Sequence, residues 1–279
     1  MARILEKRSL TPVTRLFRVE APLVAAAAMP GQFVIVRVRE GGERIPLTIA
    51  DYDRDGGTIT IVVQEVGVTT RYLGALEVGD DILDLLGPLG MPLEIPAEGH
   101  IVGIGGGFGA AALLCLMREL SARGNRATII IGARQQDLLI LVDELGAVCR
   151  DLLLCTDDGS VGFKGFVTER LGQLIDGDGP GRPDSVVAIG PMPMMRAVAE
   201  TTRAACIPTL VSLDPLMIDG TGMCGGCRVT IDGEVKFACV DGPFFDAHQV
   251  DFEEAVRRNK MYVDQERQTA CRGATSEVA

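Results

Sequence analysis

Residues 101–117, IVGIGGGFGAAALLCLM, constrain the fold more than any other stretch of this sequence of 279 residues. The run carries no charge, but five of its first nine residues are Gly and Arg118 follows it, which argues against a membrane span. A buried strand, a tight turn and a helix explain the run better. We therefore expect this segment to begin an α/β domain.

Strand-like and helical patterns alternate after this segment. The stretches ATIIIGA, LLLCTDD and SVVAIGP are typical of buried strands, and the periodic segments DLLILVDEL and PMMRAVAETTRAA predict helices between them. Such alternation indicates βαβ units. It predicts a mostly parallel, Rossmann-like sheet over residues 98–212.

The residues on either side follow different patterns. Residues 1–97 contain short β-type runs separated by turn residues, as in an antiparallel barrel. From residue 213, RVTI, the turn Asp232-Gly233 and EVKF predict a hairpin, and DFEEAVRRNKMY predicts one late helix before a loose or partner-covered tail. The predicted fold class is β plus α/β: an antiparallel barrel (1–97), a parallel-sheet domain (98–212) and a small C-terminal hairpin module (213–279).

Composition excludes two classes of partner. The formal net charge is −11 and the pI is about 4.8, whereas nucleic acid and anionic membranes attract clustered Lys and Arg. A protein or small-molecule partner is expected instead. The N-terminus has no hydrophobic signal region, so we expect a cytoplasmic protein. In that reducing compartment, the eight Cys residues are expected to be ligands or core thiols.

Three of those cysteines follow the spacing of an iron–sulfur loop. Plant-type [2Fe–2S] proteins place thiolates as C-x₄-C-x₂-C before a distant fourth Cys, and this chain offers Asp219-x₄-Cys224-x₂-Cys227 and then Cys239. A carboxylate can ligate iron, although it is a harder ligand than a thiolate. We therefore predict a cluster held by Asp219, Cys224, Cys227 and Cys239. Two alternatives stay open: Asp219 only begins a turn, or these residues bind a structural Zn²⁺.

The predicted hairpin brings these ligands together. Counting outward from the Asp232-Gly233 turn places Cys227 opposite Ala238, so Cys239 lies one step away on the neighbouring strand. Four Gly residues within 220–226 permit positive φ and let backbone N–H groups approach sulfur. Three thiolates can therefore converge.

The glycine-rich turn predicts a nucleotide site. The stretch from Gly105 to Ala110 fits G-x-G-x-x-A between a strand and a helix, where N–H donors can face a phosphate. Close packing is the alternative explanation of such glycines. Arg134 ends the next strand in place of the usual acidic residue, which by the simple rule favours NADP. Arg134 can equally pair with a carboxylate such as that of Asp137.

Two segments of the barrel offer contacts for a flavin. Arg44 to Thr48 reads RIPLT, in which Arg suits a diphosphate and the Thr hydroxyl can hydrogen-bond a ring nitrogen. Gly67 to Thr70 precedes a helix whose N-terminus can hold the same diphosphate. An ordinary strand and an ordinary helix cap explain these residues equally.

Together these segments resemble the ferredoxin–NADP reductase superfamily, and within it the branch of iron–sulfur electron-transfer subunits. The stretches LDPLMIDGTGMCGGC, IIIGARQQDLLILVDEL, CTDDGSVGFKG and GPMPMM are most similar to the small subunit of NADH-dependent ferredoxin:NADP oxidoreductase, also described as a sulfide dehydrogenase subunit, which has Asp in the first ligand position. The related electron-transfer subunit of dihydroorotate dehydrogenase is expected to use four cysteines. The likeness covers nearly the whole chain.

The resemblance implies three cofactors, which are FAD, NAD(H) and a [2Fe–2S] cluster. It implies that FAD is held by Arg44, Pro46, Leu47, Thr48, Gly67, Thr69 and Thr70. It implies that the nucleotide lies over Gly105, Gly106, Gly107, Phe108 and Gly109, with Asp157, Asp158, Gly190, Pro191 and Met192 nearby. The family expectation of NAD(H) thus opposes the preference for NADP drawn from Arg134.

The resemblance also implies an oxidoreductase subunit that needs no catalytic acid or base. Electrons would pass between NAD(H), FAD and the [2Fe–2S] cluster, and on to a larger flavoprotein subunit with [4Fe–4S] clusters, as in electron bifurcation. Three alternatives remain: the dihydroorotate dehydrogenase subunit, a stand-alone NAD(P)H diaphorase or ferredoxin reductase, and a zinc-stapled binding module.

Overall fold

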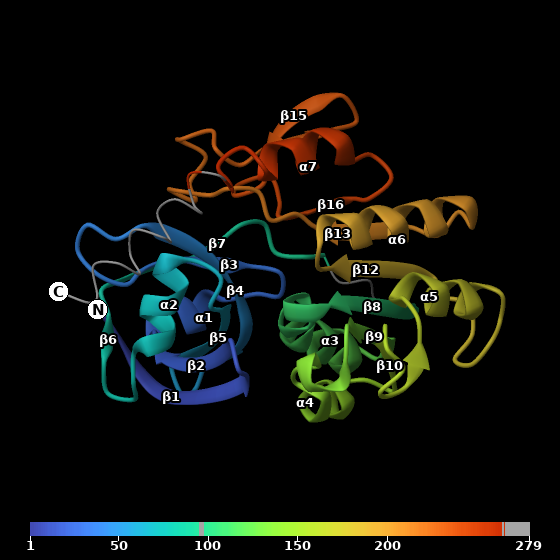
Figure 1. The fold of residues 1–279 in the computed structure, drawn as a ribbon, viewed down its shortest axis with the longest axis horizontal. Coiled ribbons are helices and arrows are strands. Elements are labelled where there is room, and N and C mark those ends of the chain that lie inside the picture. The colour runs from blue at the N-terminus through green and yellow to red at the C-terminus, as the bar shows by residue number, and fades with distance from the viewer. Residues whose placement is uncertain (95–97, 264, 266–279) are drawn as a thin grey trace.

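The computed structural model describes residues 1–94, 98–263 and 265, which form two large sheets and a separate hairpin (Figure 1). The first sheet is antiparallel, has the order β6-β1-β2-β5-β4-β3-β7 and curls into a near-barrel. Its strands are β1 (Ala2–Thr11), β2 (Thr14–Glu20), β3 (Phe33–Arg37), β4 (Arg44–Asp53), β5 (Thr58–Gln64), β6 (Asp81–Ile82) and β7 (Asp84–Leu89). Short helices α1 (Pro22–Ala27) and α2 (Val68–Ala75) pack against it.

Alternating apolar residues build the core of the near-barrel. In β5, the side chains of Ile59, Ile61 and Val63 lie in the barrel core and are almost fully buried. Burial of each such side chain stabilises the fold by about 1.5–3 kcal/mol. Val62 lies on the opposite face and packs in the core of the second sheet. The outer face of β5 is therefore also covered, by the α/β part of the chain.

The second sheet has the order β11-β10-β9-β8-β12-β13-β16, and all pairs except β13–β16 are parallel. Its strands are β8 (His100–Gly106), β9 (Arg126–Ala133), β10 (Asp151–Thr156), β11 (Phe163–Lys164), β12 (Ser185–Ile189), β13 (Thr209–Ser212) and β16 (Phe244–Asp246). The expected mostly parallel sheet is confirmed.

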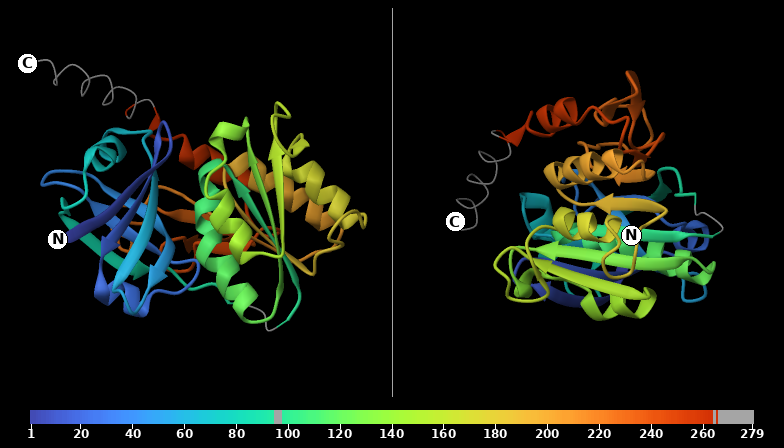
Figure 2. Two further views of the ribbon diagram at one scale, coloured as in Figure 1. Left: turned by 90° about the horizontal axis from the view of Figure 1, so that it is seen from below. Right: turned by 90° about the vertical axis from the view of Figure 1, so that its right-hand side faces the viewer.

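Helices cover both faces of this sheet (Figure 2). Strand residues alternate between the two faces, so Ile129 and Ile131 face α3 (Leu113–Ala122) and α4 (Val142–Val148). Ile130 faces α5 (Val167–Ile175) and α6 (Met192–Ala204). This burial on both faces explains why the strands read as continuous apolar runs.

Two helices begin later than their sequence patterns suggest. Residues 137–145 were expected to be helical, but the structure has a 3₁₀ turn η2 (Gln136–Leu138), a break, and then α4. Leu141 has φ of 56°, a left-handed conformation that an α-helix cannot include. After β8, the 3₁₀ segment η1 (Gly107–Ala112) likewise separates the glycine turn from α3.

The C-terminal third contains the predicted hairpin of β14 (Arg228–Ile231) and β15 (Glu234–Phe237). Asp232 and Gly233 both have positive φ, as a tight two-residue turn requires. Helix α7 (Phe252–Asn259) packs on β14, and β16 adds an antiparallel edge to the second sheet. The third segment thus also completes that sheet, and the division at residues 97 and 212 remains a proposal.

No helix within the described parts of the chain is long and apolar enough to cross a membrane. The loose or partner-covered tail expected from the sequence lies almost entirely outside the described residues. So does Cys271, for which the polar sequence around it predicts an exposed thiol.

Candidate cofactor sites

A cavity of about 660 Å³ lies between the near-barrel and the parallel sheet, within the range of roughly 300–1,000 Å³ usual for ligand pockets. It brings together residues predicted to bind different cofactors. Thr48 comes from β4, and the others follow the carboxyl ends of β8, β9, β10 and β12. The predicted residues that line it are Thr48, Gly106, Gly107, Phe108, Gly109, Arg134, Asp157, Gly190 and Pro191.

The glycines of the turn after β8 allow the backbone of this cavity wall to pack closely against its neighbours. A Cβ atom on Gly109 would lie 2.2 Å from the carbonyl oxygen of Ile189, and one on Gly106 would lie 2.5 Å from the Met194 sulfur. Gly107 has φ of 53°, which favours Gly. Gly105 does not line the cavity, and its missing side chain makes room for the backbone of Ala110. These glycines thus serve both the close packing of the backbone and the opening of the cavity beside it.

Arg134 and Asp157 directly follow the neighbouring strands β9 and β10, whose last residues, Ala133 and Thr156, are paired. The backbone N–H of Asp157 donates to the carbonyl of Ala133 at 3.1 Å, which continues the strand pairing to the cavity. Asp158 does not line the cavity; it accepts from the Ser160 hydroxyl at 2.7 Å, which lowers the pKa of its carboxyl. Met192, also outside the lining, is the first residue of α6 and is buried in the core.

The sequence analysis missed five polar residues that line the cavity, which are Thr11, Thr14, Gln64, Ser212 and Asp214. Asp214 follows β13, so its position after a parallel strand was a usable signal. Its side chain is exposed to the cavity, but the surrounding walls displace water and raise the pKa of its carboxyl to about 6. The cavity therefore contains a carboxyl group that titrates near neutral pH.

The predicted flavin contacts on β4 point in different directions. Thr48 lines the cavity, whereas the side chain of Leu47 is buried in the barrel core and Pro46 is half-buried. Arg44 borders a separate hollow beside the ion pair of Arg37 and Asp84. The strand therefore presents its hydroxyl and its cation to two different hollows.

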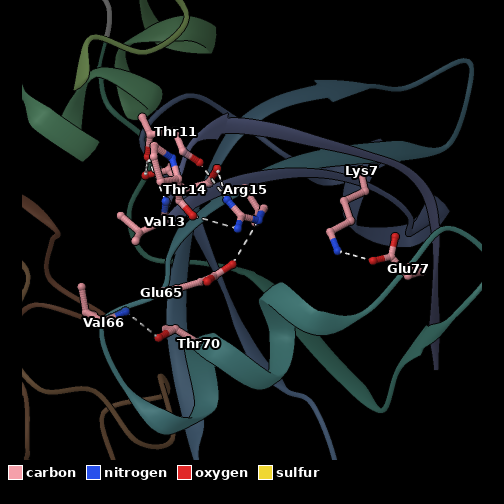
Figure 3. Close-up of polar contacts among 10 residues, drawn as sticks. Lys7, Thr11, Val13, Thr14, Arg15, Glu65, Val66, Thr70 and Glu77 are labelled. Carbon is pink, nitrogen blue, oxygen red and sulfur yellow. Dashed lines mark hydrogen bonds and ion pairs between the residues drawn. The ribbon is translucent and has the colours of Figure 1, made fainter. Parts of the chain in front are cut away.

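The start of α2 is fixed by its own hydrogen bonds (Figure 3). The Thr70 hydroxyl accepts from the backbone N–H groups of Val66, at 3.0 Å, and Gly67, at 2.8 Å. Thr70 therefore acts as a helix cap, the alternative that the sequence left open. The Thr69 hydroxyl donates to the Glu43 carboxylate at 2.7 Å, at the edge of a third hollow.

The loop that carries the predicted cluster ligands folds around the Asp219 carboxylate. This group accepts from the Thr221 hydroxyl at 2.6 Å and from the backbone N–H of Met223 at 3.0 Å. Its contact with the Cys224 thiol, followed by the contact with Thr221, holds the pKa of the carboxyl well below its usual range. Asp219 is therefore an ionised oxygen donor that is already oriented by its loop.

The other two predicted ligands lie beneath this loop. Cys227 and Cys239 are buried with their sulfur atoms 3.2 Å apart, and the Ala238 N–H donates to the Cys227 carbonyl at 3.0 Å. The predicted register is thus confirmed. Burial and then the Cys227 thiol raise the pKa of Cys239 to about 12.

The four ligands form two pairs, Asp219 with Cys224 and Cys227 with Cys239. Among residues 1–94, 98–263 and 265, no three Cys, His, Asp or Glu side chains surround one point as they would around a metal ion. The donor types nevertheless suit a two-iron cluster, because three thiolates and one carboxylate supply four protein ligands to iron. Cys224 is exposed, so the pair of Asp219 and Cys224 is accessible from solvent.

The cluster loop rests directly on the near-barrel. A Cβ atom on Gly220 would lie 2.7 Å from Leu89 of β7 and 2.8 Å from Ile35 of β3, and Gly220 itself has positive φ. Phe33 of β3 pairs with both Leu89 and Thr48. One strand therefore separates the packed end of the loop from the cavity residue Thr48.

The family model for the iron–sulfur cluster binding domain of dihydroorotate dehydrogenase B matches residues 214–251, which include all four predicted ligands. A Thermotoga maritima protein named as a homologue of the dihydroorotate dehydrogenase B (NAD⁺) electron-transfer subunit is 46% identical over 251 residues, covering 90% of this chain and 88% of that protein. A Clostridium beijerinckii protein without an assigned function is 45% identical over 273 residues, covering 95% and 92%.

Comparison with solved structures also finds similarity to oxidoreductases. The structure of an NADH-dependent reduced ferredoxin–NADP oxidoreductase, studied for flavin-based electron bifurcation, is 42% identical with a TM-score of 0.92 and covers 98% of both chains. An Amycolatopsis cytochrome P450 reductase is 24% identical with a TM-score of 0.62 over 73% of this chain and 65% of that one, which shows likeness of fold alone.

Proposed function

The chain belongs to the family of iron–sulfur electron-transfer subunits represented by dihydroorotate dehydrogenase B, and we propose that it serves an electron-bifurcating, NADH-dependent ferredoxin:NADP oxidoreductase. It is an oxidoreductase subunit of the ferredoxin–NADP reductase type, with FAD, NAD(H) and a [2Fe–2S] cluster as its cofactors. It works with a larger catalytic subunit. That this subunit carries [4Fe–4S] clusters is part of the proposal.

One observation supports the electron-transfer role in this proposal above the others, which is the packing of the cluster loop on β3. Gly220 lies against Ile35 and Leu89, and β3 pairs directly with the strand that carries Thr48. When bound, the flavin exchanges hydride with a nicotinamide and single electrons with the cluster. Thr48, the Gly106 to Gly109 turn and Asp157 hold the two nucleotides across one cavity, and the cluster loop is fixed to the same barrel.

We propose that Arg134 and Asp157 both face the nucleotide and that NAD(H) is preferred. A carboxylate at the end of β10 suits ribose hydroxyls and repels a 2′-phosphate. Arg134 lies at the end of β9, lines the same cavity and would partly offset that repulsion. The names of several relatives include NAD⁺, in agreement with this preference.

Asp219 separates this proposal from a second candidate, the electron-transfer subunit of dihydroorotate dehydrogenase. The second candidate is favoured by the names of the relatives and by the matching cluster-domain model. A dihydroorotate dehydrogenase subunit is expected to have Cys where this chain has Asp219. The carboxylate therefore favours the bifurcating oxidoreductase.

The test is isolation of the native complex under anaerobic conditions from cells that express the tagged chain. We expect a larger flavoprotein to copurify, with FAD, two iron and two sulfide per chain, and we expect NADH and reduced ferredoxin together to supply the electrons that reduce NADP. Copurification with a dihydroorotate-oxidising subunit would support the second candidate. Stoichiometric zinc, without labile sulfide or flavin, would refute both.

A further inference from the structure

Arg258, on the last turn of α7, contacts the cluster loop. Its terminal nitrogen donates to the carbonyl oxygen of Gly226 at 3.2 Å. Gly226 lies between Cys224 and Cys227, and its own N–H donates to the Cys224 sulfur at 3.4 Å. One guanidinium thus contacts the short segment that joins two predicted ligands.

The guanidinium also contains an unsatisfied donor. The Nε atom of Arg258 is buried and has no hydrogen-bond partner among the residues that the structure describes. A buried donor without a partner costs about 1–3 kcal/mol, more when it is charged. A sulfur acceptor at the loop would satisfy this donor, so the side chain is suited to an anionic group.

Helix α7 holds Arg258 rigidly in this place. Phe252 and Ala255 are buried in the same apolar core as Cys227 and Cys239. Asp251 caps the helix by accepting from the Glu254 N–H at 2.9 Å, and Glu254 in turn accepts from the hydroxyl of Thr230 on β14. The helix is therefore fixed at its start to the hairpin, beside which it lies (Figure 1).

Two physical effects follow from this contact. The Gly226 carbonyl and the Cys227 N–H belong to one peptide group, so donation to the carbonyl makes that N–H a stronger donor. In addition, a partly buried positive charge stabilises a nearby group more when that group gains negative charge. Both effects favour the reduced form of an iron–sulfur cluster and raise its reduction potential.

We propose that Arg258 is a positioning residue that orients the Gly226–Cys227 peptide and sets the reduction potential of the cluster. This inference rests on the proposed function, because it requires that the loop hold a [2Fe–2S] centre. It assigns to α7 a role in tuning electron transfer in addition to packing.

The test compares variants of the full chain, purified in its complex, by redox titration followed by EPR. Arg258→Met removes the donors and the charge, and we expect its cluster midpoint to become more negative than that of the wild type. Arg257→Met removes a charge from the neighbouring, exposed position and is expected to leave the midpoint unchanged. Arg258→Lys keeps the charge and is expected to retain part of the wild-type value.

Arg258→Gln serves as a second variant if Arg258→Met folds poorly, because it keeps a polar N–H donor, on a shorter side chain, without the charge. It is expected to shift the midpoint in the same direction. Wild-type midpoints in Arg258→Met or Arg258→Gln proteins with full cluster content would overturn the inference. A wild-type complex without a two-iron EPR signal would instead refute the proposed function itself.

Discussion

Asp219 shows how one residue sets the chemistry of the cluster loop. Its carboxylate accepts hydrogen bonds from Thr221 and Met223, so its position does not depend on a bound metal. A turn residue alone would have the same bonds, so geometry leaves its role as an iron ligand to be tested. Substitutions of Asp219 that distinguish its role as an iron ligand from its role in the turn therefore decide between the two.

We predict that Asp219→Ala loses cluster or changes its spectrum, because iron loses an anionic oxygen donor. Asp219→Cys is expected to keep the cluster with an altered midpoint, since thiolate is softer than carboxylate. Iron and sulfide analysis with EPR measures both. Asp219→Asn is the control, because it keeps most of the turn hydrogen bonds but no charge. An unchanged signal and midpoint in Asp219→Ala would make Asp219 only a turn residue.

Asp214 gives a prediction about pH. Its pKa in the folded protein, about 6, lies above the ordinary 3.8, so the folded state holds the proton more tightly than the unfolded state. The folded protein therefore loses stability as the pH rises from about 4 to about 6. We expect Asp214→Asn, which cannot ionise, to avoid this loss.

The difference in melting temperature between Asp214→Asn and the wild type should thus increase from pH 4 to pH 7. The gain should be at most on the order of 1 kcal/mol, because the carboxylate is open to water in the cavity. Asp158→Asn is a suitable comparison: because the pKa of Asp158 is lowered from 3.8, its contribution changes below about pH 4, and the difference for this variant should stay nearly constant from pH 4 to pH 7. A difference for Asp214→Asn that is constant with pH would contradict the assignment.

The glycine turn after β8 shows how an element forms one wall of the cavity. Gly109 approaches the backbone of Ile189 so closely that no side chain fits between them. Gly172 of α5 does not have this constraint, because a Cβ atom there would meet nothing within 4 Å. The same substitution should therefore have opposite effects at the two positions.

We predict that Gly109→Ala destabilises the protein by roughly 1–3 kcal/mol, because the turn must move away from Ile189. It should also weaken NADH binding at least tenfold while FAD and iron content are kept. Gly172→Ala should stabilise α5 by up to about 1 kcal/mol. Urea unfolding and calorimetric titration with NADH measure these effects. Wild-type NADH affinity in Gly109→Ala would argue against a nucleotide site over this turn.

At the scale of the whole molecule, the C-terminal segment joins the two sheets. Phe244 of β16 pairs with Ser212 of β13 in the second sheet, and its ring lies 2.7 Å from the position that a Cβ atom on Gly31 of the near-barrel would take. The N–H of Met91 donates to the carbonyl of Gly242 at 2.6 Å at the same junction. The cavity lies between the two sheets, so its shape depends on these contacts of Phe244 and Gly242 from the C-terminal segment.

We predict that Phe244→Ala lowers the free energy of unfolding by roughly 2 kcal/mol, less than for a fully buried Phe because the ring is half-buried. Loss of the ring should also loosen the junction and lower FAD retention. Phe166→Ala is the control for stability, since Phe166 is 61% exposed and should change stability by less than about 0.5 kcal/mol. Equal urea midpoints for the two variants would contradict this role of Phe244.

Local patterns were sufficient to predict much of the fold. The strands around the glycine turn, the Asp232-Gly233 hairpin and the pairing of Cys227 with Ala238 follow from alternation and turn chemistry, which act over a few residues. The late start of α4 did not follow, because the left-handed Leu141 is imposed by packing. Asp214 and Arg258 also escaped notice, since neither lies in a motif.

The sequence by itself determined which residue types could bind cofactors: the glycines after β8, the hydroxyl of Thr48, and Asp219 with three cysteines. Only the tertiary structure decided which of them share a site. It placed Thr48 and Asp157 in one cavity, Arg44 in another hollow, and Arg258 against the loop between Cys224 and Cys227. The reason is physical: ligand chemistry belongs to a side chain, whereas contacts between residues distant in sequence depend on how sheets and helices pack.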